Sequence, residues 1–260
     1  SQGLQIAAAQ NPSAELEGVA QEILRLVRQE HLHLRDISVI ARDAAPYAAD
    51  LERVFSEYDI PYFIDIAKPL VYHPLVELVR AVLDVAVGGW HYPALFRYLK
   101  NPFSPLSLEE VDTLENYCLA AGIRAHHWQS KKAWQFWPGR AEEAEEKLTE
   151  IESLRQRAAT ALAAFTDRFP PQAEVQVAEF CQALCQLLQT LDVTARLEQW
   201  QETALGQGEA ERAALDQQAW EALQGLLAET TSFLGQSSMP LAECSEVLEA
   251  GLSSLTALLI

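Results

Sequence analysis

Residues 37–65 constrain the fold of this chain more than any other stretch. A short apolar run rich in β-branched side chains opens it, an amphipathic segment follows, and residues 60–64 close it with a second apolar run broken only by Pro61. This order predicts a strand, a helix and a second strand. Parallel strands require such a crossover. Arg42 and Asp65 would then end the two strands at the carboxyl edge, where open α/β sheets place their ligands.

The residues before this stretch extend the pattern to β-α-β-α-β. Residues 4–9 predict a first short strand. Asn11 followed by Pro12 predicts the start of a helix that runs to about residue 30, because asparagine caps helices and proline suits their first position. Three parallel strands with helices on their faces make half of a nucleotide-binding type of sheet.

From about Pro74 onward the strand signals stop. Residues 75–87 are apolar on nearly every face, which predicts a buried helix. Ser107 and Glu110 have the spacing of a capping box at the start of another helix. Helical periodicity continues through most of the remaining chain, over residues 141–168 and then over about 174–191, 194–205, 209–234 and 241–257.

The predicted fold class is therefore α/β plus all-α. A partial parallel sheet occupies residues 1–73, and a mostly helical domain occupies residues 74–260. The chain ends on the apolar run Leu258-Leu259-Ile260. Natural termini are seldom of this kind, so we expect an excised piece of a longer protein.

The net charge of −18 limits the possible partners. Most of such a surface would repel a phosphate backbone, so any contact with nucleic acid must be local. No run approaches the roughly 18 apolar residues that a membrane span requires, and no signal sequence opens the chain. We expect a cytoplasmic protein that does not contact a membrane.

Four cysteines are too few and too scattered for a disulfide scaffold. Cys181 and Cys185 share one helix face, and we favour two buried thiols over a metal or cluster site, because further ligands at metal spacing are absent. His126 and His127 are adjacent, so on a helix they would point about 100° apart and would not easily share one metal. No complete catalytic motif is present, so neither a metal site nor a catalytic residue is predicted.

Residues 124–140 depart from the acidic trend, because they contain four basic residues and four large aromatics but no carboxylate. Aromatic and basic side chains that alternate can stack bases and hold phosphates, so this stretch is a candidate DNA contact. The alternative, which we favour, is a long connection pinned to the core by its tryptophans. A second candidate contact follows the third predicted strand. The candidate residues in the two places are Arg124, Trp128, Lys131, Lys132 and Lys68, Tyr72, His73.

Several short motifs together resemble one family. The chain looks like the start of the second RecA-like domain of UvrD-type superfamily 1 DNA helicases and, within that family, like the AddB subunit of the bacterial AddAB helicase–nuclease. The resemblance extends over nearly the whole chain. The residues that carry it are Ala9-Gln10-Asn11 and residues 36–42, 60–65, 73–78, 96–100 and 114–117.

The resemblance implies that residues 1–73 are a partial second RecA-like domain and that residues 74–260 are a helical insertion. The phosphate loop, the nuclease domain and the cysteines of the iron–sulfur cluster would lie outside this piece. ATP with Mg²⁺ and the cluster would therefore belong to the full-length parent, and no cofactor to this chain. The implied partners are an AddA-type helicase–nuclease subunit and DNA, the latter through the full complex.

In active relatives of this kind, an aromatic residue that stacks on adenine is followed by an arginine that reaches the γ-phosphate. Arg42 matches the arginine, but Ala41 occupies the aromatic position. An alanine cannot stack, a loss of about 1–3 kcal/mol by analogy with bases on aromatic side chains. We therefore expect Arg42 to be a vestigial nucleotide-facing residue.

The leading hypothesis is a non-catalytic, helicase-like piece of an ATP-dependent deoxyribonuclease subunit that helps to handle DNA in double-strand-break repair by recombination. One alternative is a part of an active superfamily 1 helicase motor, in which Arg42 senses the γ-phosphate. The other is a helical protein-interaction module without a nucleic-acid role, which the acidic charge would suit.

Overall fold

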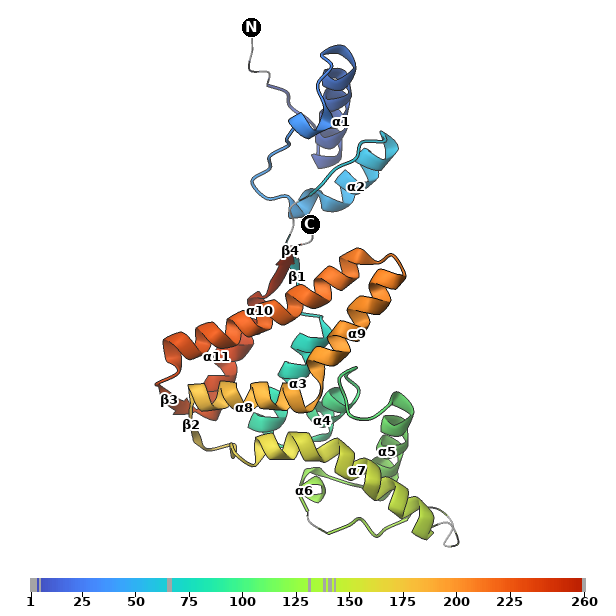
Figure 1. The fold of residues 1–260 in the computed structure, drawn as a ribbon, viewed down its shortest axis with the longest axis vertical. Coiled ribbons are helices and arrows are strands. Elements are labelled where there is room, and N and C mark those ends of the chain that lie inside the picture. Colours follow the sequence, from blue (N-terminus) through green and yellow to red (C-terminus); the bar gives the residue numbers. More distant parts are fainter. Residues whose placement is uncertain are drawn as a thin grey trace. The chain divides into compact units, whose positions relative to one another are not determined.

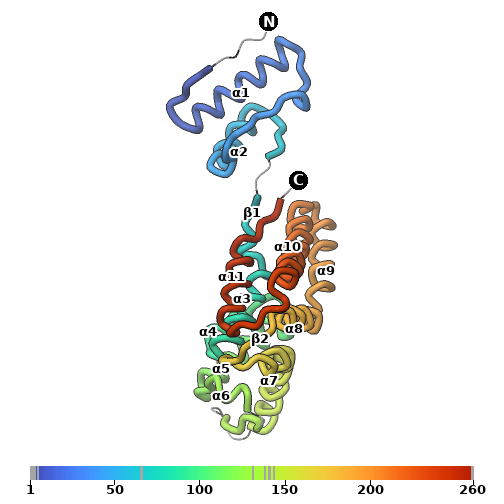
Figure 2. The backbone as a smooth tube through the Cα atoms, turned by 90° about the vertical axis from the view of Figure 1, so that its left-hand side faces the viewer, coloured from blue at the N-terminus to red at the C-terminus, as the bar shows by residue number. Residues whose placement is uncertain are grey.

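The computed structural model describes residues 4, 6–64, 67–130, 132–137, 139, 142 and 144–258. The chain divides into two compact units, Ser1–Ala67 with Leu258–Ile260 and Lys68–Ala257. The division lies a few residues before the boundary that the sequence suggested after residue 73. Figures 1 and 2 show the elements of each unit in two views.

Two helices form the first unit. Helix α1 (Pro12–Gln29) begins as predicted, with Pro12 in its first turn and the Asn11 side chain accepting a hydrogen bond of 2.8 Å from the Ala14 N–H. Two short 3₁₀ turns (Leu34–Asp36 and Ala45–Tyr47) precede helix α2 (Ala48–Glu57). The two helices share a small core, formed by Leu16, Ala20, Ile23, Leu51, Val54, Phe55 and Ile60.

The predicted strands at 4–9, 37–41 and 60–64 are not found among the described residues, and neither is a parallel sheet. A strand is stable only when a neighbour pairs with its backbone N–H and C=O groups. The described part of this unit supplies no such neighbour, and Leu4, Ile6 and Ile40 are 89%, 89% and 93% exposed. The prediction of a β-α-β-α-β sheet within the chain is therefore wrong for the described residues, although its two helices are correct.

The second unit is mostly helical, as predicted. Its helices are α3 (Pro74–Gly88), α4 (Tyr92–Leu99), α5 (Leu108–Ala121), α6 (Ala125–Trp128), α7 (Ala144–Thr166), α8 (Val177–Thr190), α9 (Val193–Gly206), α10 (Ala210–Leu234) and α11 (Leu241–Ser254). Strands β2 (Glu174–Gln176) and β3 (Ser238–Pro240) pair antiparallel, with Val175 opposite Met239. Strands β1 (Ala67–Pro69) and β4 (Thr256–Leu258) form the other two-stranded sheet.

Helix α3 is the central helix of this unit. Its apolar residues are buried, as the sequence predicted, and it contacts α4, α7, α10 and α11. Both views show α11 beside α3 and α10 beside α9 (Figures 1 and 2). The long helix α7 packs on α5 and α8. Two helices from distant parts of the sequence, α3 and α11, are thereby brought side by side.

Local capping signals fix where α5 begins and ends. The Ser107 hydroxyl accepts from the Glu110 N–H, and the Glu110 carboxylate accepts from the Ser107 N–H, which confirms the predicted capping box. Gly122 ends the helix in the left-handed region, with φ of +64°. Glycine adopts this conformation without the steric cost that a side chain would add.

Candidate functional site

Arg42, the predicted nucleotide-facing residue, lies in the first unit at an exposed bend that follows the exposed Ala41. No described residue forms an ion pair or hydrogen bond with its guanidinium group. Asp65, which was expected at the same sheet edge, lies outside the described residues. The Arg42 side chain is therefore accessible, and the described part of the chain does not form a nucleotide site around it.

The three candidates after the third predicted strand differ in their surroundings. Lys68 forms an ion pair with Glu211 of α10, so its charge is already balanced. Tyr72 is 89% exposed. His73 is buried, so its ring is not available to a ligand in solution. Lys68 and Tyr72 are both exposed, but only Tyr72 has no ion-pair or hydrogen-bond partner among the described residues.

His73 has a structural role instead. Its Nδ1 accepts a hydrogen bond of 3.2 Å from the Leu75 N–H and so caps α3, while its Nε2 lies 3.0 Å from Oδ1 of Asp216 in α10. This pattern places the proton of the neutral ring on Nε2. Burial lowers the pKa of His73, and the neighbouring carboxylate of Asp216 offsets only part of that shift.

The tryptophans of residues 124–140 face the core. Trp128 and Trp134 are 5% and 8% exposed, and their rings meet edge to face at 5.1 Å. Trp134 and Trp137 both stack on the Tyr117 ring of α5, at 5.6 Å and 6.2 Å between centroids. The buried ring of Trp128 offers no face to a base. This arrangement agrees with the interpretation that we favoured, a connection pinned by its tryptophans.

Arg155 of α7 holds the segment of residues 124–140 against the core. Its guanidinium group donates to the carbonyls of Trp128 and Ser130 at 3.3 Å and 3.0 Å and lies over the Trp134 ring. An ion pair with Glu152 balances its charge.

Several side chains of the connection remain on the surface. Arg124, Lys132 and Phe136 are exposed, whereas Lys131 and Arg140 lie outside the described residues. The exposed groups keep the combination of two cations and one aromatic ring that suits a nucleic-acid strand.

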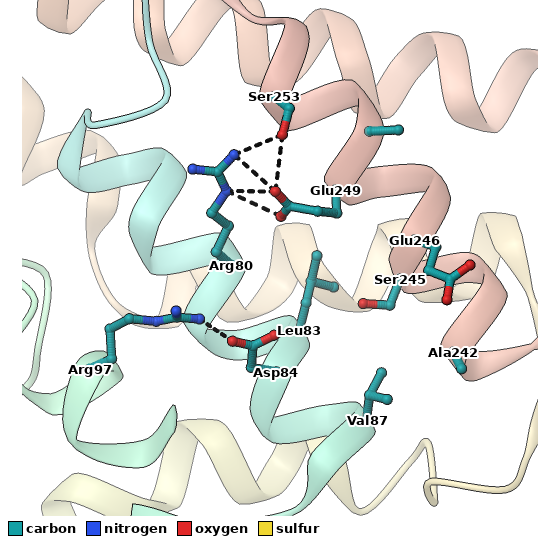
Figure 3. Close-up of a pocket in the computed structure, with 11 residues that line it drawn as sticks. Arg80, Leu83, Asp84, Val87, Arg97, Ala242, Ser245, Glu246, Glu249 and Ser253 are labelled. Atoms are coloured by element: carbon teal, nitrogen blue, oxygen red, sulfur yellow. Dashed lines mark hydrogen bonds and ion pairs between the residues drawn. The ribbon is translucent and has the colours of Figure 1, made fainter. Parts of the chain in front are cut away.

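An open groove of about 660 Å³ lies between α3 and α11, and the sequence did not suggest it. Its lining contains the apolar side chains of Leu83 and Val87, small residues of α11, two guanidinium groups and three carboxylates. Figure 3 shows Arg80 pointing toward Glu249 and Ser253, and Arg97 toward Asp84. The lining residues are Arg80, Leu83, Asp84, Val87, Arg97, Ala242, Ser245, Glu246, Glu249, Ala250 and Ser253.

The Arg80 side chain is saturated with hydrogen bonds. Its Nε donates to both oxygens of Glu249 at 2.9 Å and 3.1 Å, and Nη2 donates to the Ser253 hydroxyl at 2.9 Å. Nη1 donates to the Val71 carbonyl and to Glu77, at 2.9 Å and 3.0 Å. Arg80 therefore joins α3 to α11 and has little capacity left for an anionic ligand.

A signal for the groove was present in the sequence. Glu77, Arg80 and Asp84 recur at helical spacing within an otherwise apolar segment, so they form a polar stripe along α3. Such a stripe indicates that one face of a buried helix meets charged partners. The stripe did not show which residues these partners are, because Asp84 pairs with Arg97 of α4 and Arg80 pairs with Glu249 of α11, 169 residues later.

The cysteines are free thiols. Cys181 is buried as predicted, but Cys185, about one turn further along α8, is exposed, so the prediction of two buried thiols is wrong for Cys185. Burial raises the pKa of Cys118 and of Cys244 to about 12, which disfavours the reactive thiolate. Among the described residues, no group of three potential ligands is placed to hold a metal ion, and no helix is long and apolar enough to cross a membrane.

Comparison with known proteins gives relatives over nearly the whole chain. The B subunit of the ATP-dependent helicase/deoxyribonuclease of Moorella thermoacetica is 39% identical over 263 residues, which cover 99% of this chain and 23% of the relative. The B subunits of the same name from Desulfitobacterium hafniense and Heliobacterium modesticaldum are 36% and 37% identical over 97% and 100% of this chain. No family model matches the chain.

These similarities place the chain with subunits of ATP-dependent helicase/deoxyribonucleases. Within that class it is homologous to a segment of the B subunit, AddB, which confirms the resemblance inferred from the sequence. The chain spans between a fifth and a quarter of the length of these relatives, at 21% to 23%.

Proposed function

We propose that this chain is a non-catalytic part of an AddB-type subunit, which supports DNA handling by a helicase–nuclease during double-strand-break repair by recombination in the cytoplasm. The observation that carries the proposal is the 35–39% identity to B subunits over nearly the whole chain. The proposed partners are an AddA-type subunit and, through the full complex, DNA.

The first unit is proposed to be a partial RecA-like domain whose sheet is completed by other segments of the full-length protein. Its exposed apolar residues, such as Ile6 and Ile40, support this proposal, because apolar strand residues are normally covered. The alanine at position 41 supports the loss of adenine stacking at this edge. ATP with Mg²⁺ and an iron–sulfur cluster are assigned to other parts of the parent, and none of the four cysteines is assigned to the cluster.

The proposed DNA contact is the exposed part of the connection between α5 and α7. Arg124 and Lys132 supply positive charge in a stretch free of carboxylates, and the exposed Phe136 supplies an aromatic face. His73 and Trp128 are no longer proposed as contacts because they are buried, and Lys68 is already paired.

Charge reversal in the full-length parent, assembled with its partner subunit, tests this contact. We expect Arg124→Glu together with Lys132→Glu to weaken binding of a single-stranded oligonucleotide. The slope of log affinity against log salt should fall by about 0.7 for each phosphate that the variant no longer binds. Arg212→Glu is the matched control, because Arg212 is exposed on α10 and lies outside the connection.

An unchanged slope in the double variant would favour the protein-interaction alternative. ATPase or nuclease activity in the purified chain itself would contradict the non-catalytic assignment.

A further inference from the structure

We propose that the groove between α3 and α11 is a docking site for a polypeptide segment of the partner subunit, one that presents a basic side chain to Glu246. The proposal rests on the proposed function to the extent that a partner subunit exists. The surface, the chemistry of its occupant and the contact residues follow from the groove itself.

The positive charges of the groove are already balanced by carboxylates. Arg80 is saturated by Glu249, Glu77, the Ser253 hydroxyl and a backbone carbonyl, and Arg97 pairs with Asp84. Since three carboxylates face two guanidinium groups, the groove as a whole repels an anion. Nucleic acid is therefore a poor occupant, whereas a cationic peptide is favoured.

Glu246 is the one of the three carboxylates in the groove that has no ion-pair partner among the described residues. The carboxylates of Asp84 and Glu249 are each bound by an arginine, but no described residue forms an ion pair or hydrogen bond with Glu246. Figure 3 shows it on α11 beside Ser245, away from both arginine pairs. The groove contains two ion pairs, Arg80 with Glu249 and Arg97 with Asp84, and one unpaired carboxylate. A lysine or arginine of a docked segment would form an ion pair with that carboxylate.

The walls of the groove suit a helix or an extended segment. Leu83 and Val87 supply apolar surface from α3, while Ala242, Ala250 and Ser245 of α11 are small enough for close approach of another backbone. An amphipathic helix binds in such a groove by laying its apolar face against the apolar surface of the groove.

The groove is also held in shape before any partner binds. Arg80 joins α3 to α11 through Glu249 and Ser253, and Arg97 of α4 joins Asp84 on the same side of α3. The opposite face of α3 is buried in the core. A preformed groove lowers the cost of ordering on binding.

The test uses the full-length parent and the purified partner subunit, with the dissociation constant of the complex as the measurement. We expect Glu246→Arg, which places a like charge opposite the basic side chain, and Ala250→Trp, which fills the groove, each to weaken assembly at least tenfold. The controls are Glu229→Arg on α10 and Ala120→Trp on α5, both at exposed positions outside the groove. These should remain within twofold of the unmodified protein.

Circular dichroism and the thermal midpoint of each variant without the partner show whether it folds normally. Assembly within twofold of the unmodified protein in both groove variants would overturn the proposal. A lowered midpoint of the full-length variants, with no such loss in the isolated chain, would also overturn it and would assign the groove to another segment of the same subunit. Failure of the unmodified parent to assemble with the partner subunit would instead contradict the proposed function.

Discussion

At the scale of single residues, the buried pair of His73 and Asp216 joins the start of α3 to α10. His73 uses both ring nitrogens, one as the cap of α3 and the other toward the carboxylate, so the neutral ring with its proton on Nε2 fits the site. Protonation of Nδ1 would remove the acceptor of the Leu75 N–H. The charge state of one side chain therefore affects the start of the central helix.

The pKa of His73, which burial lowers below the ordinary value of 6.5, gives a pH dependence of stability. As the pH falls through about 6.5, the unfolded chain takes up a proton before the folded chain does, so the free energy of unfolding decreases. The stabilising contribution of neutral His73 is complete above that pH and is lost below it. We expect thermal midpoints to be lower at pH 5.5 than at pH 7.5.

The matched variant is His73→Asn, which can still accept a hydrogen bond as a helix cap but does not titrate. The difference between the two midpoints should become smaller in this variant, whatever its absolute stability. A difference equal to that of the unmodified chain would show that another group is responsible.

At the scale of elements, the helices with local signals could be predicted and the strands could not. Asn11 with Pro12, and Ser107 with Glu110, determine where α1 and α5 begin through contacts within four residues. The apolar segments at 37–41 and 60–64 have the composition of strands, but pairing depends on distant neighbours that composition does not reveal. The groove was missed for the same reason, because it forms where α3 meets α11.

Two glycines of the second unit give opposite predictions for the same substitution. Gly122 ends α5 with φ of +64°, so Gly122→Ala should destabilise the unit by about 1–2 kcal/mol. Gly225 lies inside α10, so Gly225→Ala should stabilise it by about 0.5–1 kcal/mol.

An added Cβ atom would meet nothing within 4 Å at either position. The direction of each change in the free energy of unfolding therefore depends on the backbone conformation alone. Chemical denaturation measures the free energy of unfolding of each variant. Changes of the same sign would contradict the assigned backbone conformations.

At the scale of the whole molecule, the sequence predicted a partial parallel sheet followed by a mostly helical domain, and only the helical domain is found among the described residues. The sequence also indicated a resemblance to AddB, which the relatives confirm. From the net charge of −18 we predict that few surfaces suit DNA, and this stays a prediction. The net charge alone does not show which basic side chains already form ion pairs within the chain. Lys68 and Arg80 both do. Those pairs depend on the tertiary fold, so candidate contacts could be narrowed only after the structure was known.

The central claim, that this segment does not carry the motor chemistry, is tested most directly by Arg42→Ala in the full-length parent assembled with its partner subunit. The measurement is the rate of ATP-driven unwinding of a duplex under saturating ATP. Because the neighbouring Ala41 cannot stack on adenine and Arg42 is exposed without a described partner, we predict a rate equal to that of the unmodified complex. Loss of unwinding would contradict the account and would identify Arg42 as a working γ-phosphate sensor.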